Sequence, residues 1–314
     1  MEARDITASG PAGITRRLEA ASPRYGEKAI VAALAACALL SVVTTTAIVI
    51  ALIGPTVGFF QDVPITDFLF GTDWFPQFEP ASFGVLPIVV GTLSVTLWGM
   101  LVAIPIGLGA AIYLSEYANP RVRKVVKPAL EVLAGIPTVA IGFFAVAFIT
   151  PDIIQKLATS APIFLALSAG IGIGLMVVPI IASISEDAMG AVPGGLREGA
   201  YAMGATRMRV ATRVVFPAAL SGIVASIVLA ISRAVGETMI VVLAAGSTPN
   251  LTFDPLQPIQ AMTAYIATIA TGEVAQGTTE YDTIFAVGTL LFVITLAMNL
   301  ISIRLVRRFR EVYE

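Results

Sequence analysis

The sequence has no histidine, and its single cysteine, Cys37, lies inside an apolar run. Without histidine the chain lacks the commonest general base and metal ligand, which excludes a Ser–His hydrolase and an H-E-x-x-H zinc protease. One cysteine forms no disulfide within the chain. No glycine is followed directly by lysine. The phosphate-cradling loop G-x-x-x-x-G-K-[ST] is therefore missing, and the chain does not hydrolyse ATP itself.

Charge is scarce as well. Only 13% of the 314 residues are charged, whereas 57% are hydrophobic, and the mean hydropathy is +0.88. A soluble domain is usually about 25% charged and about 45–50% apolar. The composition therefore predicts an integral membrane protein.

Six apolar runs are long enough to cross the hydrocarbon core, which takes about 20 residues. We place these runs near residues 29–53, 84–114, 129–150, 162–185, 220–246 and 284–304. They predict an all-α, polytopic bundle of six transmembrane helices. The corresponding organisation is an N-terminal arm at 1–27, a membrane domain at 28–310 and a short tail at 311–314.

Basic residues set the expected orientation. Of 19 Lys and Arg, 17 lie before the first run, between the second and third, between the fourth and fifth, or after the sixth. The opposite side carries only Lys156. Because cytoplasmic loops are enriched in Lys and Arg, both termini and the segment 186–217 are predicted to be cytoplasmic. The loops 55–83 and 247–283 are then external.

The external loops have distinct compositions. Loop 55–83 is rich in aromatic residues, which fits either an interfacial aromatic belt or a docking surface for an external partner. In loop 247–283 the apolar stretch 258–270 is too short to span, so we expect an interfacial or re-entrant helix there.

The last basic residue, Arg233, falls at the centre of the fifth run, and Glu237 follows four residues later. In a continuous helix the two side chains share one face. A charge at this depth costs about 2.5–3.5 kcal/mol, so it marks a function or a structural pair. Arg233 could contact an anion with Glu237 as its gate partner, or the two could lock helices together. Glu131 and Glu186 are expected near the interface.

The cytoplasmic segment 186–217 predicts helix, corner and helix. Pro193 and two glycines make a turn. Leu196 to Met203 favours a helix that Gly204 ends. Thr206 can cap a second helix. Such an element presents a small knob to a groove in a partner.

This segment resembles the EAA loop of ABC importer permeases. The match is Glu198-Gly-Ala200, then Gly204, Val214 and Phe216-Pro217, with Gly199, Val214 and Phe216 replacing the usual alanine, isoleucine and leucine. The resemblance implies that Glu198, Ala200 and Gly204 contact the ATPase subunit. An ion-coupled secondary transporter would not need such a dock, and an aspartyl protease would need membrane aspartates that the runs lack.

Four further segments are similar to the PstC type of phosphate importer permease: 68–76, 83–93, 133–144 and 232–239. The resemblance covers roughly residues 65–310 and implies the type I ABC importer permease fold. It implies import of inorganic phosphate, or of another oxyanion, by alternating access in the plasma (inner) membrane. Arg233, Glu237 and Thr138 then line the path.

The implied partners are a P-loop ATPase dimer that binds ATP and Mg²⁺, a second permease of the PstA type, an external phosphate-binding protein and membrane lipid. Neither a cofactor or metal of the chain's own nor nucleic acid is expected.

Overall fold

The computed structural model describes residues 25–308. The predicted tail and all but the last three residues of the predicted arm lie outside them. The backbone divides into two units at Ala51. Helix α1 (Tyr25–Asp62) crosses this division. Nearly all of its apolar side chains before Ala51 are exposed, as Ile30 and Leu39 illustrate at 63% and 65%, which suits a lipid-facing helix.

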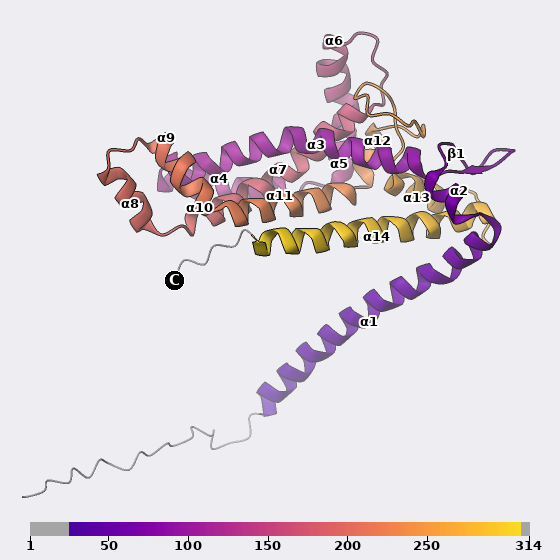
Figure 1. Cartoon of the computed structure of the whole chain (residues 1–314), viewed down its shortest axis with the longest axis horizontal. Helices are drawn as coiled ribbons and strands as arrows, with labels where there is room; N and C mark the ends of the chain where they lie inside the picture. The colour runs from indigo at the N-terminus through magenta and orange to yellow at the C-terminus, as the bar shows by residue number, and fades with distance from the viewer. Residues whose placement is uncertain (1–24, 309–314) are drawn as a thin grey trace, which may run out of the picture. The chain divides into compact units, whose positions relative to one another are not determined.

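Residues 52–308 are mostly helical, with one two-stranded hairpin (Figure 1). The symbol η marks π-helical turns. In chain order the elements are α2 (Ile65–Phe70), β1 (Trp74–Phe75), β2 (Ser82–Phe83), α3 (Leu86–Ile112), η1 (Tyr113–Tyr117), α4 (Pro120–Leu133), α5 (Thr138–Phe144), η2 (Ala145–Ile154), α6 (Gln155–Leu157), α7 (Ala166–Gly190), α8 (Gly194–Ala202), α9 (Arg207–Val210), η3 (Ala211–Val215), α10 (Phe216–Ala218), α11 (Leu220–Val235), α12 (Met239–Ala244), α13 (Met262–Thr271) and α14 (Thr279–Arg308).

Within residues 25–308, five helices are long and apolar enough to cross a membrane: 26–62, 86–117, 138–157, 166–190 and 279–304. A sixth span arises if the pair 207–218 and 220–235, bent by 73°, is counted as one. The all-α membrane fold is confirmed. The predicted third run, 129–150, is wrong at its start. The chain breaks at residues 134–137, of which Pro137 is the last, and the preceding α4 has no buried residue.

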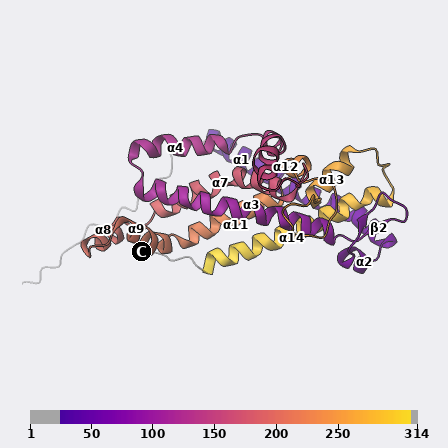
Figure 2. The same cartoon turned by 90° about the horizontal axis from the view of Figure 1, so that it is seen from above.

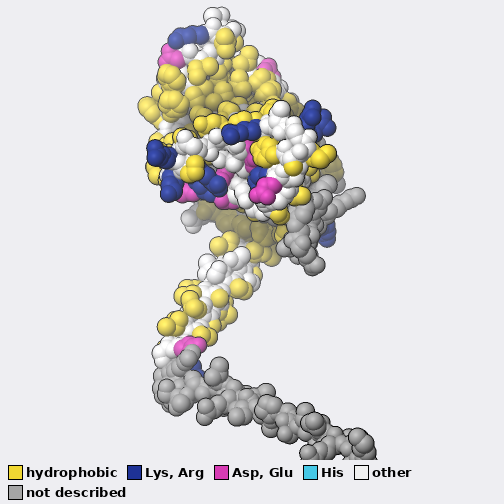
Figure 3. All heavy atoms as spheres, turned by 90° about the vertical axis from the view of Figure 1, so that its left-hand side faces the viewer, with side chains coloured by type: hydrophobic (Ala, Val, Ile, Leu, Met, Phe, Trp, Pro, Cys, Tyr) yellow, Lys and Arg dark blue, Asp and Glu magenta, His cyan; other side chains and the backbone are white. Residues whose placement is uncertain are grey.

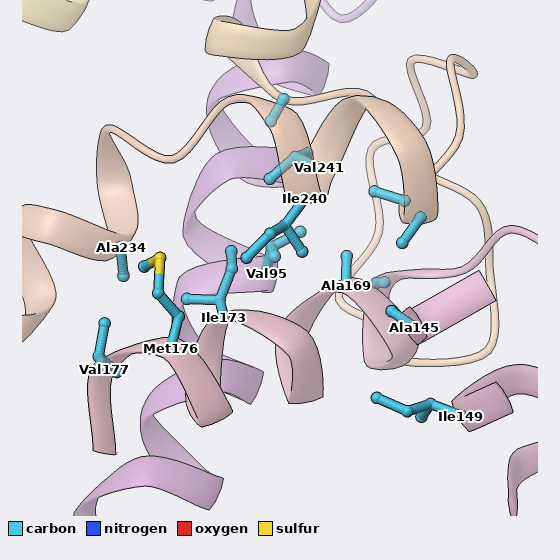
Figure 4. Packing of buried hydrophobic residues seen from close by; sticks show 14 of the residues in the cluster. Val95, Ala145, Ile149, Ala169, Ile173, Met176, Val177, Ala234, Ile240 and Val241 are labelled. Atoms are coloured by element: carbon cyan, nitrogen blue, oxygen red, sulfur yellow. The ribbon is translucent and has the colours of Figure 1, made fainter. Parts of the chain in front are cut away.

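Helices α3 and α7 form the spine of the larger unit, since small residues let their backbones approach closely. A Cβ at Gly99 would lie 3.1 Å from the Gly170 carbonyl oxygen, and one at Gly174 would lie 2.9 Å from the Gly99 carbonyl oxygen. Around this pair, Figure 4 shows Ala234 of α11 beside Met176 and Ile240 of α12 beside Ile173. The central core therefore ties both halves of the fifth span to α7.

The end of the larger unit that holds the hairpin has its own aromatic core. Phe59, Phe68 and Trp74 are at most 1% exposed, and Trp74 packs edge-on to Tyr265 of α13 at 4.9 Å between ring centroids. Neither a lipid belt nor a docking surface describes these three rings. Their packing also makes α13 part of a core. Figures 1 and 2 show α2 and the hairpin at one end and α8 with α9 at the other.

Candidate functional site

Arg233 lies in the last turn of α11, and its side chain is exposed. It is the thirteenth residue after Leu220, hence about 20 Å along the helix axis. Within residues 25–308 no hydrogen bond or ion pair of the structure involves its guanidinium. A cation at this depth is costly against lipid, so the surface around Arg233 is suited to a polar path or a protein partner.

Glu237 does not share a helical face with Arg233, contrary to the sequence expectation. Helix α11 ends at Val235, Gly236 caps it, and α12 starts only at Met239. The Glu237 side chain is buried, and its Oε1 accepts hydrogen bonds from the backbone N–H groups of Met239 (3.1 Å) and Ile240 (3.4 Å). Its carboxylate thus caps α12, because the first N–H groups of a helix need acceptors.

The break is held from outside the fifth span as well. Thr263 of α13 donates its hydroxyl to the Glu237 carbonyl oxygen at 2.7 Å. Beside Arg233, the Ser232 hydroxyl donates to Asn299 Oδ1 of α14 at 3.0 Å. The sequence interpretation missed Asn299, although it is the only amide side chain in the run 284–304. The structure therefore adds a second exposed polar group next to the arginine.

Thr138 is half-buried and begins α5 directly after the break at residues 134–137. Its helix packs on the start of α12: a Cβ at Gly142 would lie 3.0 Å from Ile240 Cα and 3.2 Å from the Met239 carbonyl oxygen. The structure thus brings the helix of Thr138 against α12, the helix that Glu237 caps. No hydrogen bond in the described part of the chain joins Thr138 to Arg233 or Glu237.

The segment from α8 to α9 folds as predicted. Gly204 has φ +77°, its N–H donates to the Tyr201 carbonyl, and the Ala205 N–H donates to the Ala200 carbonyl. These two bonds are the Schellman ending of a helix, and its left-handed residue favours glycine. Thr206 Oγ1 accepts from the Arg209 N–H at 3.4 Å and starts α9. The corner needs Gly204 for its backbone.

The α8 helix offers a projecting surface. No residue of α8 is fully buried. Glu198 is exposed, and Leu196, Tyr201 and Met203 are 40%, 43% and 89% exposed. Figure 3 faces this end of the molecule and shows Lys and Arg side chains around it. An exposed helix with apolar side chains and one carboxylate can dock in a groove of a partner.

Between α4 and α7, acids and bases form a cluster around one buried carboxylate. Glu186, near the end of α7, is fully buried within the protein and contacts Arg123 and Lys127 of α4. Lys127 also contacts Asp187. Burial of Lys127 opposes its charge, but hydrogen bonds and attraction from Asp187 and Glu186 outweigh it and raise its pKa. Since α4 buries no residue of its own, these ion pairs fasten it to α7.

Comparison with known proteins identifies the class. Residues 103–311 match the family of binding-protein-dependent transport system inner membrane components, and the chain belongs to this family. By fold, it resembles a chain of a bacterial alginate ABC transporter at 19% identity, with a TM-score of 0.64 over 93% of this chain and 100% of that one. It is thus a permease subunit of the type I ABC importer fold, whose ATPase is a separate partner.

Two curated relatives are closer in sequence. The probable ABC transporter permease protein YqgH of Bacillus subtilis is 35% identical over 274 residues, 87% of each chain. The phosphate transport system permease protein PstC of Xylella fastidiosa is 32% identical, with 75% of this chain and 76% of the relative covered. The resemblance to PstC-type permeases is therefore confirmed at the level of sequence.

Proposed function

We propose that the chain is the PstC-type subunit of an ATP-driven importer that moves inorganic phosphate into the cytoplasm by alternating access. The observation that carries this proposal is the exposed guanidinium of Arg233, deep in a span and free of any ion pair among residues 25–308. Its planar fork of donors matches phosphate oxygens. Relatives called phosphate transport system permease proteins support the same substrate.

The path in this proposal runs along the face of α11 that carries Arg233. Ser232 and Asn299 add polar groups beside the guanidinium. Thr138 lies farther along, on the helix that packs against α12. Glu237 acts as the gate through the break, because the carboxylate that caps α12 is also the nearest acid to Arg233 along the chain. Weak and exchangeable contacts suit a conduit better than one tight site does.

The proposed assembly has one more permease, of the PstA type, and an external phosphate-binding protein that delivers the anion. A P-loop ATPase dimer that binds ATP and Mg²⁺ docks on helix α8. Glu198, Ala200 and Gly204 form or support the contact. The α8 end and both chain termini face the cytoplasm, in line with the distribution of Lys and Arg. The chain itself needs no cofactor.

Uptake of radiolabelled phosphate by the complete complex in proteoliposomes tests the site. Arg233→Ala removes charged hydrogen bonds worth about 1.5–3 kcal/mol each, so uptake should fall by about 10- to 100-fold while the complex still assembles. Arg233→Lys keeps the charge but not the fork, and an intermediate loss is expected. Lys156→Ala, an exposed lysine paired with Asp152, is the matched control. Wild-type uptake with Arg233→Ala would remove Arg233 from the path.

Another oxyanion is the second candidate, since the guanidinium fork fits sulfate as well as phosphate. Competition separates the two. Excess unlabelled phosphate should abolish the uptake of labelled phosphate by the wild-type complex, and excess sulfate should leave it intact. Uptake of labelled sulfate, but not of labelled phosphate, by the same complex would reverse the substrate assignment.

A further inference from the structure

One guanidinium at the α8 end of the molecule joins three elements. Arg197 of α8 donates from Nε and Nη2 to Glu116 Oε1 of η1, at 3.2 and 2.9 Å. Its Nη2 also donates to the Met189 carbonyl oxygen and its Nη1 to the Val192 carbonyl oxygen, both at 2.7 Å. The side chain thus links α8 to the end of α7 and to the turn that follows α3.

The link is shielded from solvent. The Glu116 side chain is 5% exposed and that of Arg197 is 20% exposed. Ser115 donates a further hydrogen bond to the same carboxylate oxygen at 3.0 Å. Charged hydrogen bonds of this kind are stronger and more directional than neutral ones, and the planar guanidinium fixes the direction of each.

Little else holds the first turn of α8. A Cβ at Gly194 or Gly195 would meet nothing within 4 Å, and neither would one at Gly199 in the next turn. The apolar contacts of α8 with the neighbouring core come from Ala200 at its far end. The Arg197 contacts are therefore the main side-chain link between the first turn of α8 and the spans.

We propose that Arg197 is the positioning residue of coupling: it carries a displacement of α8 to the ends of α3 and α7 at once. This inference rests on the proposed function, in which the ATPase docks on α8, and Arg197 directly precedes the docking residue Glu198. Helices α3 and α7 are in close backbone contact and share a core with α11 and α12. Movement of their ends thus reaches the break beside Arg233.

The test uses the complete complex, with its ATPase, second permease and binding protein, in proteoliposomes. Arg197→Ala leaves the outer face of α8 intact, so the ATPase should still co-purify and its basal hydrolysis should stay within about twofold. Uptake should fall about tenfold, which raises the ATP hydrolysed per phosphate imported by the same factor. Arg197→Lys should lie between wild type and Arg197→Ala. Arg209→Ala, an exposed arginine on α9, should behave as wild type.

A second variant keeps the test decisive if Arg197→Ala does not fold. Glu116→Gln preserves the size of the side chain and its acceptor oxygen but removes the charge. Phosphate uptake should therefore fall about threefold. In the double variant Arg197→Ala/Glu116→Gln the losses should be less than multiplicative, because both act through one contact.

Two results would overturn the proposal: an unchanged ratio of ATP to phosphate in Arg197→Ala, or a loss of uptake that only follows lost ATPase binding. The latter would reduce Arg197 to a support for the dock. Failure of the proposed function looks different, since the wild-type chain itself would then neither bind the ATPase nor import phosphate.

Discussion

The charges at the α8 end of the molecule and the charge at the end of α11 are arranged in opposite ways. Beside α8, Arg197 meets a buried carboxylate and two carbonyls, and between α4 and α7 Lys127 meets two carboxylates. At the end of α11, Arg233 is exposed and meets no acid of residues 25–308. An arginine side chain thus joins helices at position 197, whereas at position 233 it is free to contact a ligand or a partner.

The difference follows from what each charge can reach. A buried ion pair is lost at high cost once one partner is removed, because the other remains desolvated. Removing an exposed, unpaired cation leaves no desolvated partner charge behind. The ion pairs of Glu186 should therefore matter mainly for stability, and Arg233 mainly for transport.

The largest effect on stability is expected at Glu186. Glu186→Ala leaves Arg123 without its acid and Lys127 with Asp187 alone. Breaking a fully buried pair from one side costs about 3–5 kcal/mol. Because the side chains of Arg123 and Lys127 are 43% and 24% exposed, the cost should lie below this range, and the melting temperature of the purified protein should still fall clearly. Glu186→Gln keeps the shape and should cost less.

Arg233→Ala is the matched variant for Glu186→Ala, since it removes a charge without a partner in the described chain. Its melting temperature should stay close to that of wild type. If Arg233→Ala proved as destabilising as Glu186→Ala, the arginine would be a structural clasp and the contrast between the two regions would fail.

A smaller effect is expected at the corner of the docking segment, where no charge changes. Gly204→Ala forces a Cβ into the left-handed region at φ +77°, at a cost of about 1–2 kcal/mol. Gly199→Ala lies inside α8, where a Cβ meets open space, and should gain about 0.5–1 kcal/mol. Thermal unfolding and ATPase co-purification of the two variants should move in opposite directions. Equal stabilities would show that the corner does not depend on its glycine.

The structure of the α8 end was easier to predict from the sequence than that of the break after α11. The corner at Gly204 and the cap at Thr206 are local devices, set by a few neighbouring residues, and both were predicted correctly. The six apolar runs likewise follow from hydropathy alone, and they were sufficient to predict an all-α membrane fold.

The break after Val235 depends on contacts that no short pattern contains. Glu237 turns back to cap α12, and Thr263 of α13, 26 positions later in the chain, holds its carbonyl. Spacing of four residues implied a shared face only if the helix continued. In the same way, the burial of Glu186 depends on Arg123 and Lys127, which belong to another helix.

The smallest effect expected concerns pH and Lys127. Its pKa is raised above the ordinary 10.5 because Asp187 and Glu186 favour the charged form more than burial opposes it. The unfolded chain therefore loses this proton at lower pH than the folded one. The stabilisation is complete below about pH 10.5 and disappears as the pH rises through the folded-state value.

The difference in melting temperature between wild type and Lys127→Met isolates this contribution from other groups that titrate in base. It should be constant from pH 7 to about 9.5 and shrink above about 10.5. The exposed pair Lys156–Asp152 supplies the control, because Lys156→Met should show a difference near zero throughout. If the difference for Lys127→Met grew with pH, burial of the ammonium would oppose its charge more than Asp187 and Glu186 favour it. Contacts other than this lysine would then have to hold α4 against α7.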